Sequence, residues 1–192
     1  MQINDHYALI VIDVQRGFEA ETWPRRNNPA CEENVARLLD EWRRRGRPVV
    51  FVRHSSQKAG SPLAAGTPGH EFKPVITGEP DLMIEKRVHS AFYGQPDLDG
   101  WLQERAIEGV VVTGIATDHC CETTARMAGD LGYQVLFPLD ATHTFDRTGP
   151  DGAVVAADDV AARTAASLHR EFAIVTTTAD VMEASRETSK EG

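Results

Sequence analysis

Short apolar runs alternate with amphipathic helical patterns along the whole of this chain. The apolar runs predict six strands, at residues 8–13, 48–53, 82–86, 109–114, 134–138 and 173–176. Continuous apolar strands separated by helices are typical of a parallel sheet that is buried on both faces. The order of these segments therefore predicts an α/β fold with three layers, helices on both faces of a central sheet.

The spacing of apolar residues also predicts the connecting helices. They lie at residues 33–45, 98–106, 119–131, 154–172 and 179–185. Right-handed crossovers in this order are compatible with a doubly wound, Rossmann-like sheet of six mainly parallel strands in the order 3-2-1-4-5-6. The pattern alone does not determine that strand order.

Composition narrows the class of protein. A chain of 192 residues, 41% hydrophobic and 26% charged, suits one domain over residues 1–192. No apolar run approaches the roughly 18 to 20 residues of a membrane span, and no secretory signal precedes the first strand. We therefore expect a cytoplasmic protein that makes no contact with a membrane. The net charge of −9 argues against a nucleic-acid partner.

The common nucleotide fingerprints are absent from the sequence. No G-x-G-x-x-G follows the first strand, and no G-x-x-x-x-G-K occurs. We therefore expect no cofactor. Two long connections, residues 55–79 and 140–153, are candidates for functional loops, and the first of them is either a lid or a partner-binding segment.

The run from Thr113 to Cys120 joins the end of a buried strand to the start of a helix. We expect Thr117 or Asp118 to cap that helix, which places Cys120 in its first turn. Free backbone N–H groups and the helix dipole stabilise a thiolate or an oxyanion there. The position predicts a nucleophile.

Two charged residues end strands at the same edge of the predicted sheet. Asp13 ends the first strand and Lys86 ends the third, and ligands of open α/β sheets bind at this edge. Asp13 could accept the proton of Cys120, while Lys86 could lower the pKa of the thiol. Either residue alone is more often structural, but the three together indicate catalysis.

Three motifs in register carry a family resemblance. They are Ile12-Asp13-Val14-Gln15 with Phe18, Lys86 followed by Ser90-Ala91-Phe92, and the run from Gly114 to Cys120. Together they resemble the isochorismatase-like cysteine hydrolases, a superfamily that includes nicotinamidases, N-carbamoylsarcosine amidohydrolases and ureidoacrylate hydrolases.

The resemblance implies roles for individual residues. It implies that Asp13 is the general base, Lys86 the electrostatic partner and Cys120 the nucleophile. It further implies a cis peptide bond between Ile115 and Ala116, with the N–H groups of Ala116 and Cys120 forming an oxyanion hole. Relatives usually carry valine at the position of Cys121, so we interpret Cys121 as a packing residue.

Two departures from the relatives narrow the expected chemistry. Nicotinamidases carry an Asp-x-His after the second strand that binds a metal, whereas this chain has Val52-Arg53-His54-Ser55-Ser56. The remaining histidines show no metal-binding spacing, so we assign no metal. Isochorismatases proper lack the nucleophilic cysteine, and Cys120 therefore argues for acyl transfer from an amide.

Residues that flank the motifs are candidates for binding the substrate, although aromatic side chains near strand ends are as often part of a core. The candidates are Gln15, Phe18, Trp23, Arg53, His54, Phe92, Tyr93, Thr117 and His143.

The sequence thus predicts a cysteine-dependent hydrolase that cleaves a C–N bond of a small amide, carbamoyl or ureide substrate through a thioester. Three alternatives stay open: a nicotinamidase-type amidase with an atypical metal site, a redox sensor using Cys120 and Cys121, and a non-catalytic member of the fold. The resemblance also implies a homo-oligomer, either a dimer or a tetramer.

Overall fold

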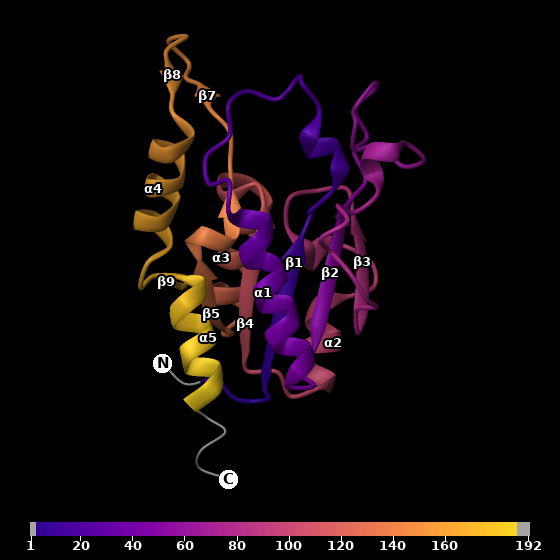
Figure 1. Cartoon of the computed structure of the whole chain (residues 1–192), viewed down its shortest axis with the longest axis vertical. Coiled ribbons are helices and arrows are strands. Elements are labelled where there is room, and N and C mark those ends of the chain that lie inside the picture. Colours follow the sequence, from indigo (N-terminus) through magenta and orange to yellow (C-terminus); the bar gives the residue numbers. More distant parts are fainter. Residues whose placement is uncertain (1–2, 188–192) are drawn as a thin grey trace.

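The computed structural model describes residues 3–187, and a parallel sheet runs through its centre (Figure 1). The strand order is β3-β2-β1-β4-β5-β9, and the short strand β6 pairs with the end of β4. The bounds are β1 Tyr7–Ile12, β2 Val49–His54, β3 Leu82–Lys86, β4 Gly109–Ile115, β5 Gln134–Pro138, β6 Thr142–His143 and β9 Ile174–Thr176. The predicted order is confirmed, with β9 as the sixth of the predicted strands.

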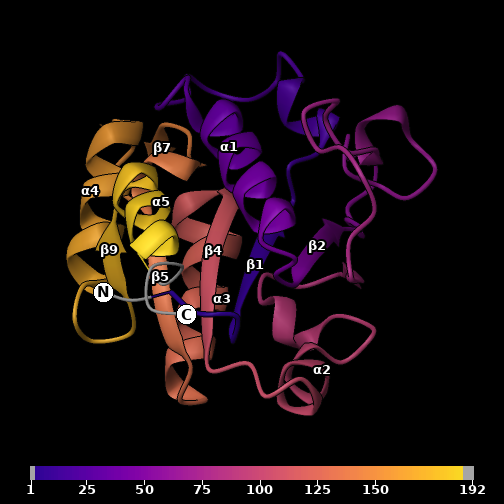
Figure 2. The same ribbon diagram turned by 60° about the horizontal axis from the view of Figure 1, so that its bottom comes forward.

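Helices cover both faces of the sheet. Figures 1 and 2 show α1 and α5 side by side on one face, and their apolar residues share a core with Leu9 and Val11 of β1. Ile10 and Ile12 point to the opposite face, where α2, α3 and α4 lie. The helices are α1 Cys31–Arg44, α2 Leu98–Glu104, α3 Glu122–Asp130, α4 Ala157–Leu168 and α5 Thr178–Glu187. Because successive side chains of a strand alternate between faces, a fully apolar β1 serves both cores.

The helix predicted over residues 154–172 is shorter in the structure. A two-stranded antiparallel hairpin, β7 (Arg147–Thr148) with β8 (Val154–Val155), precedes α4. The backbone N–H of Ala157 donates to the Asp146 carboxylate at 2.8 Å, and this contact anchors the start of the helix. Val154, 70% exposed, belongs to the hairpin and not to a buried helical face.

All strands of the main sheet point their carboxyl ends to one edge, at the top of Figure 1. Three segments rise above that edge: the loop after β1, the connection between β2 and β3, and the β7–β8 hairpin. Open α/β sheets bind ligands at this edge, so these segments surround the expected site. Among the helices of residues 3–187, none has the length and apolar character needed to cross a membrane.

Candidate active site

A buried ion pair lies where β1 and β3 end. Lys86 Nζ donates to Asp13 Oδ2 at 2.6 Å, and both side chains are fully buried. Charges inside a protein are tolerated only when they are paired, and this pair supplies each buried group with its counter-charge. Burial alone would lower the pKa of Lys86, but Asp13 and then Cys120 outweigh it and the pKa is raised. Lys86 is therefore a fixed cation.

The third residue of the site lies on the turn after β4. Cys120 belongs to a π-helical turn, η4 (Thr117–Cys121), which leads directly into α3. Its Sγ accepts a hydrogen bond from Lys86 Nζ at 3.3 Å. The structure thus brings the three residues that were predicted from separate strand ends into one cluster.

The predicted cap of this helix is wrong. Ala116 occupies the N-cap position and no side chain caps the turn. Thr117 instead donates to the Thr142 hydroxyl at 2.8 Å, and the Asp118 carboxylate binds the Arg147 guanidinium through two hydrogen bonds of 2.9 Å. Both side chains tie the turn to the segment after β5, so they position Cys120 without serving the helix N-terminus.

The pKa of the Cys120 thiol also differs from the sequence-based expectation. Burial raises the pKa of Cys120 above its ordinary value, and the Asp13 carboxylate raises it further, while Lys86 opposes both effects. The expected lowering of the pKa by Lys86 is thus outweighed, because only 6% of the Cys120 residue is exposed to solvent. In the resting site the sulfur carries its proton. A base is therefore required before it can attack.

The backbone around η4 is held by a close approach of two strands. Gly114 adopts φ +122°, and a Cβ at this position would lie 2.0 Å from the carbonyl oxygen of Ile12. Only glycine allows β4 to pass β1 this closely at that φ. The next peptide bond, between Ile115 and Ala116, is cis. The Ala116 carbonyl accepts hydrogen bonds from the N–H groups of His119 and Cys121, at 3.1 and 3.2 Å, so the turn wraps around Ala116.

A cavity of about 550 Å³ opens beside the three catalytic candidates. Asp13, Ala116 and Cys120 lie on its wall, and so do three of the predicted binding residues: Phe18, Trp23 and His54. The aromatic rings of Phe18 and Trp23 pack against each other, with centroids 5.1 Å apart. This volume suits a small molecule.

Two of the other predicted binding residues serve the scaffold. The Gln15 side chain is fully buried and bonds to the backbone of His54 and His70, so its amide joins β1, β2 and the following loop. Thr117 is equally buried against Thr142. Neither lies on the cavity wall, because the hydrogen bonds of both side chains are used within the fold, and their role in binding the substrate stays a prediction.

Four further predicted binding residues lie outside the cavity as well. Arg53 stacks over the ring of Phe72 at 4.7 Å, and Phe92 packs against Tyr133. Tyr93 is 72% exposed, while His143 is completely buried. The prediction placed Arg53, Phe92, Tyr93 and His143 by their proximity in sequence to the motifs. Arg53 and His143 lie in β2 and β6, while Phe92 and Tyr93 lie in the 3-10 turn η3 (Ala91–Tyr93), and none of the four lines the cavity.

The structure adds residues that the sequence analysis did not select. From the predicted loop at residues 55–79 it adds Ser56, Gln57, Lys58, Ser61 and Leu63, and from elsewhere Arg87, Val88, His89, His119, Phe145 and Arg147. Two features of the sequence indicated some of these residues. Residues 87–89 directly follow Lys86, and Phe145 lies in the predicted functional loop at residues 140–153. The connection at 55–79 therefore forms part of the wall of the site.

Three histidines lie on the segments around the catalytic candidates, and one of them contacts the sulfur. His89 Nδ1 lies 3.6 Å from Cys120 Sγ, and His54 Nδ1 lies 3.5 Å from Lys86 Nζ. His70 bonds to the Ser55 hydroxyl at 2.8 Å. Within residues 3–187, no group of three or more histidine, cysteine, aspartate or glutamate side chains is arranged to hold a metal ion.

Comparison with known proteins agrees with this fold. The Isochorismatase domain family matches residues 7–180, and this chain belongs to that family. Among curated proteins, nicotinamidase 3 of Arabidopsis thaliana is 36% identical over 153 residues, covering 72% of this chain and 74% of that protein.

Two solved structures resemble the whole chain. A putative hydrolase of the isochorismatase family from Chromobacterium violaceum superposes with a TM-score of 0.92 at 35% identity, covering 97% of each chain. A cysteine hydrolase from Pseudomonas syringae pv. phaseolicola superposes with a TM-score of 0.87 at 27% identity, covering 97% of this chain and 96% of that one. The protein is therefore an enzyme, a hydrolase of the isochorismatase family.

Proposed function

We propose that this hydrolase cleaves a C–N bond of a small amide, carbamoyl or ureide substrate, with Cys120 as nucleophile, Asp13 as general base and Lys86 as electrostatic partner. One observation carries the proposal. Within the part of the chain that the structure describes, the buried Oδ1 of Asp13 has no hydrogen-bond partner, while Oδ2 is held by Lys86. A free carboxylate oxygen beside a protonated thiol is the arrangement that proton transfer from sulfur needs.

The first half of the reaction forms a thioester. Asp13 takes the proton of Cys120, and the sulfur attacks the carbonyl carbon of the substrate. The ammonium group of Lys86, 3.3 Å from the sulfur, stabilises the thiolate as it forms. Collapse of the tetrahedral intermediate breaks the C–N bond, and the proton held by Asp13 passes to the departing amine or ammonia.

In the second half of the reaction, water is the nucleophile and the Cys120 thiol is the leaving group. Asp13 removes a proton from water, the hydroxide attacks the thioester carbonyl, and the thiol leaves with that proton. In both halves we assign the negative oxygen of the intermediate to the N–H groups of Ala116 and Cys120. Support for this assignment comes from the η4 turn, which wraps around Ala116 on the cavity wall next to the sulfur.

The test compares two buried cysteines. Cys120→Ala removes the proposed nucleophile, whereas Cys31→Ala removes a thiol in the core under α1. In an ammonia-release screen over small amides, carbamoyl compounds and ureides, we expect the Cys31 variant to retain turnover and the Cys120 variant to lose it, by at least about 10³-fold. Intact-mass spectrometry of the wild type should capture an acyl adduct on Cys120. Turnover that survives in Cys120→Ala would overturn the proposal.

The redox alternative receives no support from the geometry. Cys120 and Cys121 are adjacent in a helical turn and Cys121 is completely buried in the core beneath α3. Side chains of adjacent helical residues diverge, so a disulfide between them would demand a rearranged backbone. The assembly into a dimer or tetramer and the cytoplasmic location stay predictions.

A further inference from the structure

The charges around the cavity differ in sign from the protein as a whole. The chain carries a net charge of −9, yet Asp13 is the single carboxylate among the described residues that line the cavity, and Lys86 neutralises it. Lys58 and Arg87 also line this cavity. A positive pocket in an acidic protein is a feature that selects its ligand.

The two cations have no partner of their own. Lys58 comes from the connection between β2 and β3, and Arg87 is the residue after β3. Among residues 3–187, no acidic side chain forms an ion pair with either of them. Arg147 differs, because its guanidinium is already bound by Asp118. Two uncompensated positive charges therefore face the space that the substrate enters.

Two histidines on the wall, His54 and His119, add no charge of their own. Burial lowers the pKa of His54 and of His119, so both imidazoles are neutral at pH 7. The Trp23 indole already donates to the Gly17 carbonyl at 2.8 Å. Recognition of a charged substrate group thus falls on Lys58 and Arg87, while Phe18, Trp23 and Phe145, whose rings stack together, offer an apolar surface.

From this arrangement we infer that the substrate is a small amide, carbamoyl or ureide compound that carries a carboxylate, held by Lys58 and Arg87 while its reacting carbonyl meets Cys120. The inference rests on the proposed role of Cys120 as nucleophile. Two separate cations suit an anionic group, and a neutral amide of the same size would leave both of them without a counter-charge.

A pair of alkylating reagents tests the inference without knowledge of the substrate. Iodoacetate and iodoacetamide have nearly the same size, and each forms an S–C bond with release of iodide, but only iodoacetate carries a carboxylate. We measure the rate of labelling of Cys120 by each reagent, divide the two rates, and compare that ratio with the same ratio for free cysteine. The expected ratio is about tenfold or more above that of free cysteine at low salt, falling as ionic strength rises.

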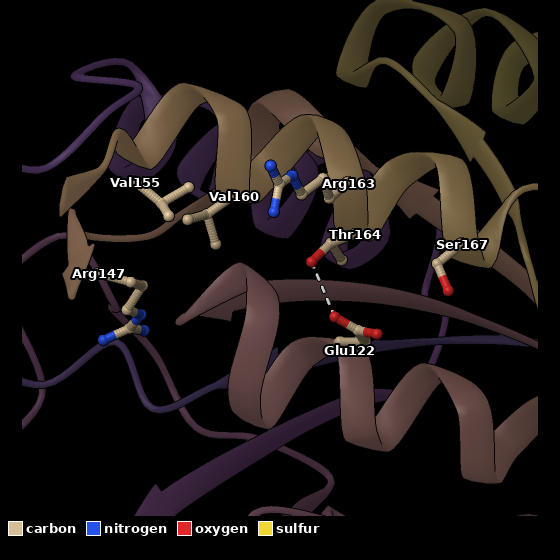
Figure 3. A pocket seen from close by; sticks show the side chains of 7 residues that line it. All are labelled: Glu122, Arg147, Val155, Val160, Arg163, Thr164 and Ser167. Carbon is tan, nitrogen blue, oxygen red and sulfur yellow. Dashed lines mark hydrogen bonds between the residues drawn. The ribbon is translucent and has the colours of Figure 1, made fainter. Parts of the chain in front are cut away.

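Variants assign the preference to its residues. Lys58 and Arg87 are exposed, so Lys58→Gln and Arg87→Gln leave the core untouched. Each should lower the ratio of iodoacetate to iodoacetamide labelling, and the double variant should bring it close to that of free cysteine. The matched control is Arg163→Gln on α4. Arg163 lines a neighbouring groove beside Glu122 and Thr164 (Figure 3) that shares Arg147 with the cavity, but Arg163 itself does not line the cavity, so the variant should keep the wild-type ratio.

The outcomes separate the two proposals. If Cys120 labels with both reagents in the ratio of free cysteine, the carboxylate inference is wrong and the nucleophile stands. If Arg163→Gln lowers the ratio as much as Arg87→Gln, the preference reflects the general field of the protein and the assigned pocket is wrong. If neither reagent labels Cys120 at all, the proposed function itself fails.

Discussion

Two clusters in this protein each contain a lysine, a carboxylate and a cysteine but differ in what they can do. One is the catalytic cluster, Asp13, Lys86 and Cys120. The other is the scaffold cluster, Cys31 and Glu32 at the start of α1 with Lys73 from the connection between β2 and β3. The lysine to carboxylate distance is 2.6 Å in both.

The two carboxylates differ in how many of their oxygens accept hydrogen bonds. Glu32 is bound by Lys73 and also by two hydrogen bonds from Arg26, of 2.7 and 2.8 Å, so both of its oxygens are occupied. Burial raises its pKa but Arg26 and Lys73 outweigh that effect and lower it to about 2. Asp13 keeps one oxygen unbound, and its cysteine lies on a cavity. The same three kinds of functional group therefore make a site only where a hydrogen-bond acceptor is unoccupied and a cavity adjoins it.

The largest expected effect is the loss of turnover when Asp13 is neutralised, with Glu32 neutralised as the comparison. Asp13→Asn removes the proposed base, and we expect turnover of an accepted amide to fall by on the order of 10³-fold, because the thiol keeps its proton. Glu32→Gln should leave turnover near the wild-type value and instead lower the free energy of unfolding by roughly 2 kcal/mol, since Lys73 and Arg26 lose their shared counter-charge. Steady-state ammonia release and urea denaturation check the pair. Equal losses of turnover in the two variants would erase the distinction.

A second prediction concerns the backbone that holds the catalytic cluster. Gly114→Ala places a methyl group against the Ile12 carbonyl, which forces β4 away from β1. We expect about 2 to 4 kcal/mol of lost stability together with lost turnover. The matched change is Gly132→Ala, where φ is also positive, at +94°, but a Cβ meets no atom within 4 Å. Thermal unfolding and turnover of the two variants separate the close approach from the φ angle, and equal losses would show that φ alone is responsible.

A third prediction uses the histidine beside the scaffold cluster. Burial, then the charge of Arg26, lowers the pKa of His143 to about 3. In the unfolded chain this residue binds a proton below about pH 6.5, whereas the folded chain does not until about pH 3. Stability should therefore fall as pH decreases through this window, by up to about 1.4 kcal/mol per pH unit from this residue.

His143→Leu tests that contribution. Both ring nitrogens of His143 are buried and lack hydrogen-bond partners among the described residues, so leucine breaks no such bond. Urea denaturation at several pH values between 7 and 4 should give the variant a shallower decrease of stability than the wild type. Parallel pH profiles would contradict the assignment.

The smallest expected effect is at Cys121. It is buried beside Cys120 but no hydrogen bond joins it to Lys86 in the described structure, and burial raises the pKa of its thiol. Cys121→Val replaces the thiol by an apolar side chain of similar shape that is larger by about one methyl group, so we expect turnover within about twofold of wild type and a stability change of about 1 kcal/mol. Turnover and thermal unfolding measure both. A large loss of turnover would mean that the two thiols of η4 act together.

Much of the architecture was predictable from local pattern. The strands β3 and β5 have the predicted ends, because continuous apolar runs bounded by polar residues define buried strands. The helix before β9 was predicted too long, since the apolar Val154 continues the helical pattern although it lies on the exposed β7–β8 hairpin. Contacts with residues far apart in the chain decide where such a helix begins, and the local pattern of apolar residues carries no information about those contacts.

The site divides in the same way. The sequence by itself determined the α/β class, the strand ends that carry Asp13 and Lys86, and the position of Cys120 after β4, because strand periodicity and chain direction are local properties. Only the tertiary structure decided that the thiol keeps its proton, that Gln15 and Thr117 serve the scaffold, and that Lys58 and Arg87 face the cavity. Burial, hydrogen-bond saturation and the sign of a pocket's charge are sums over residues far apart in the chain, and they exist only once the chain is folded.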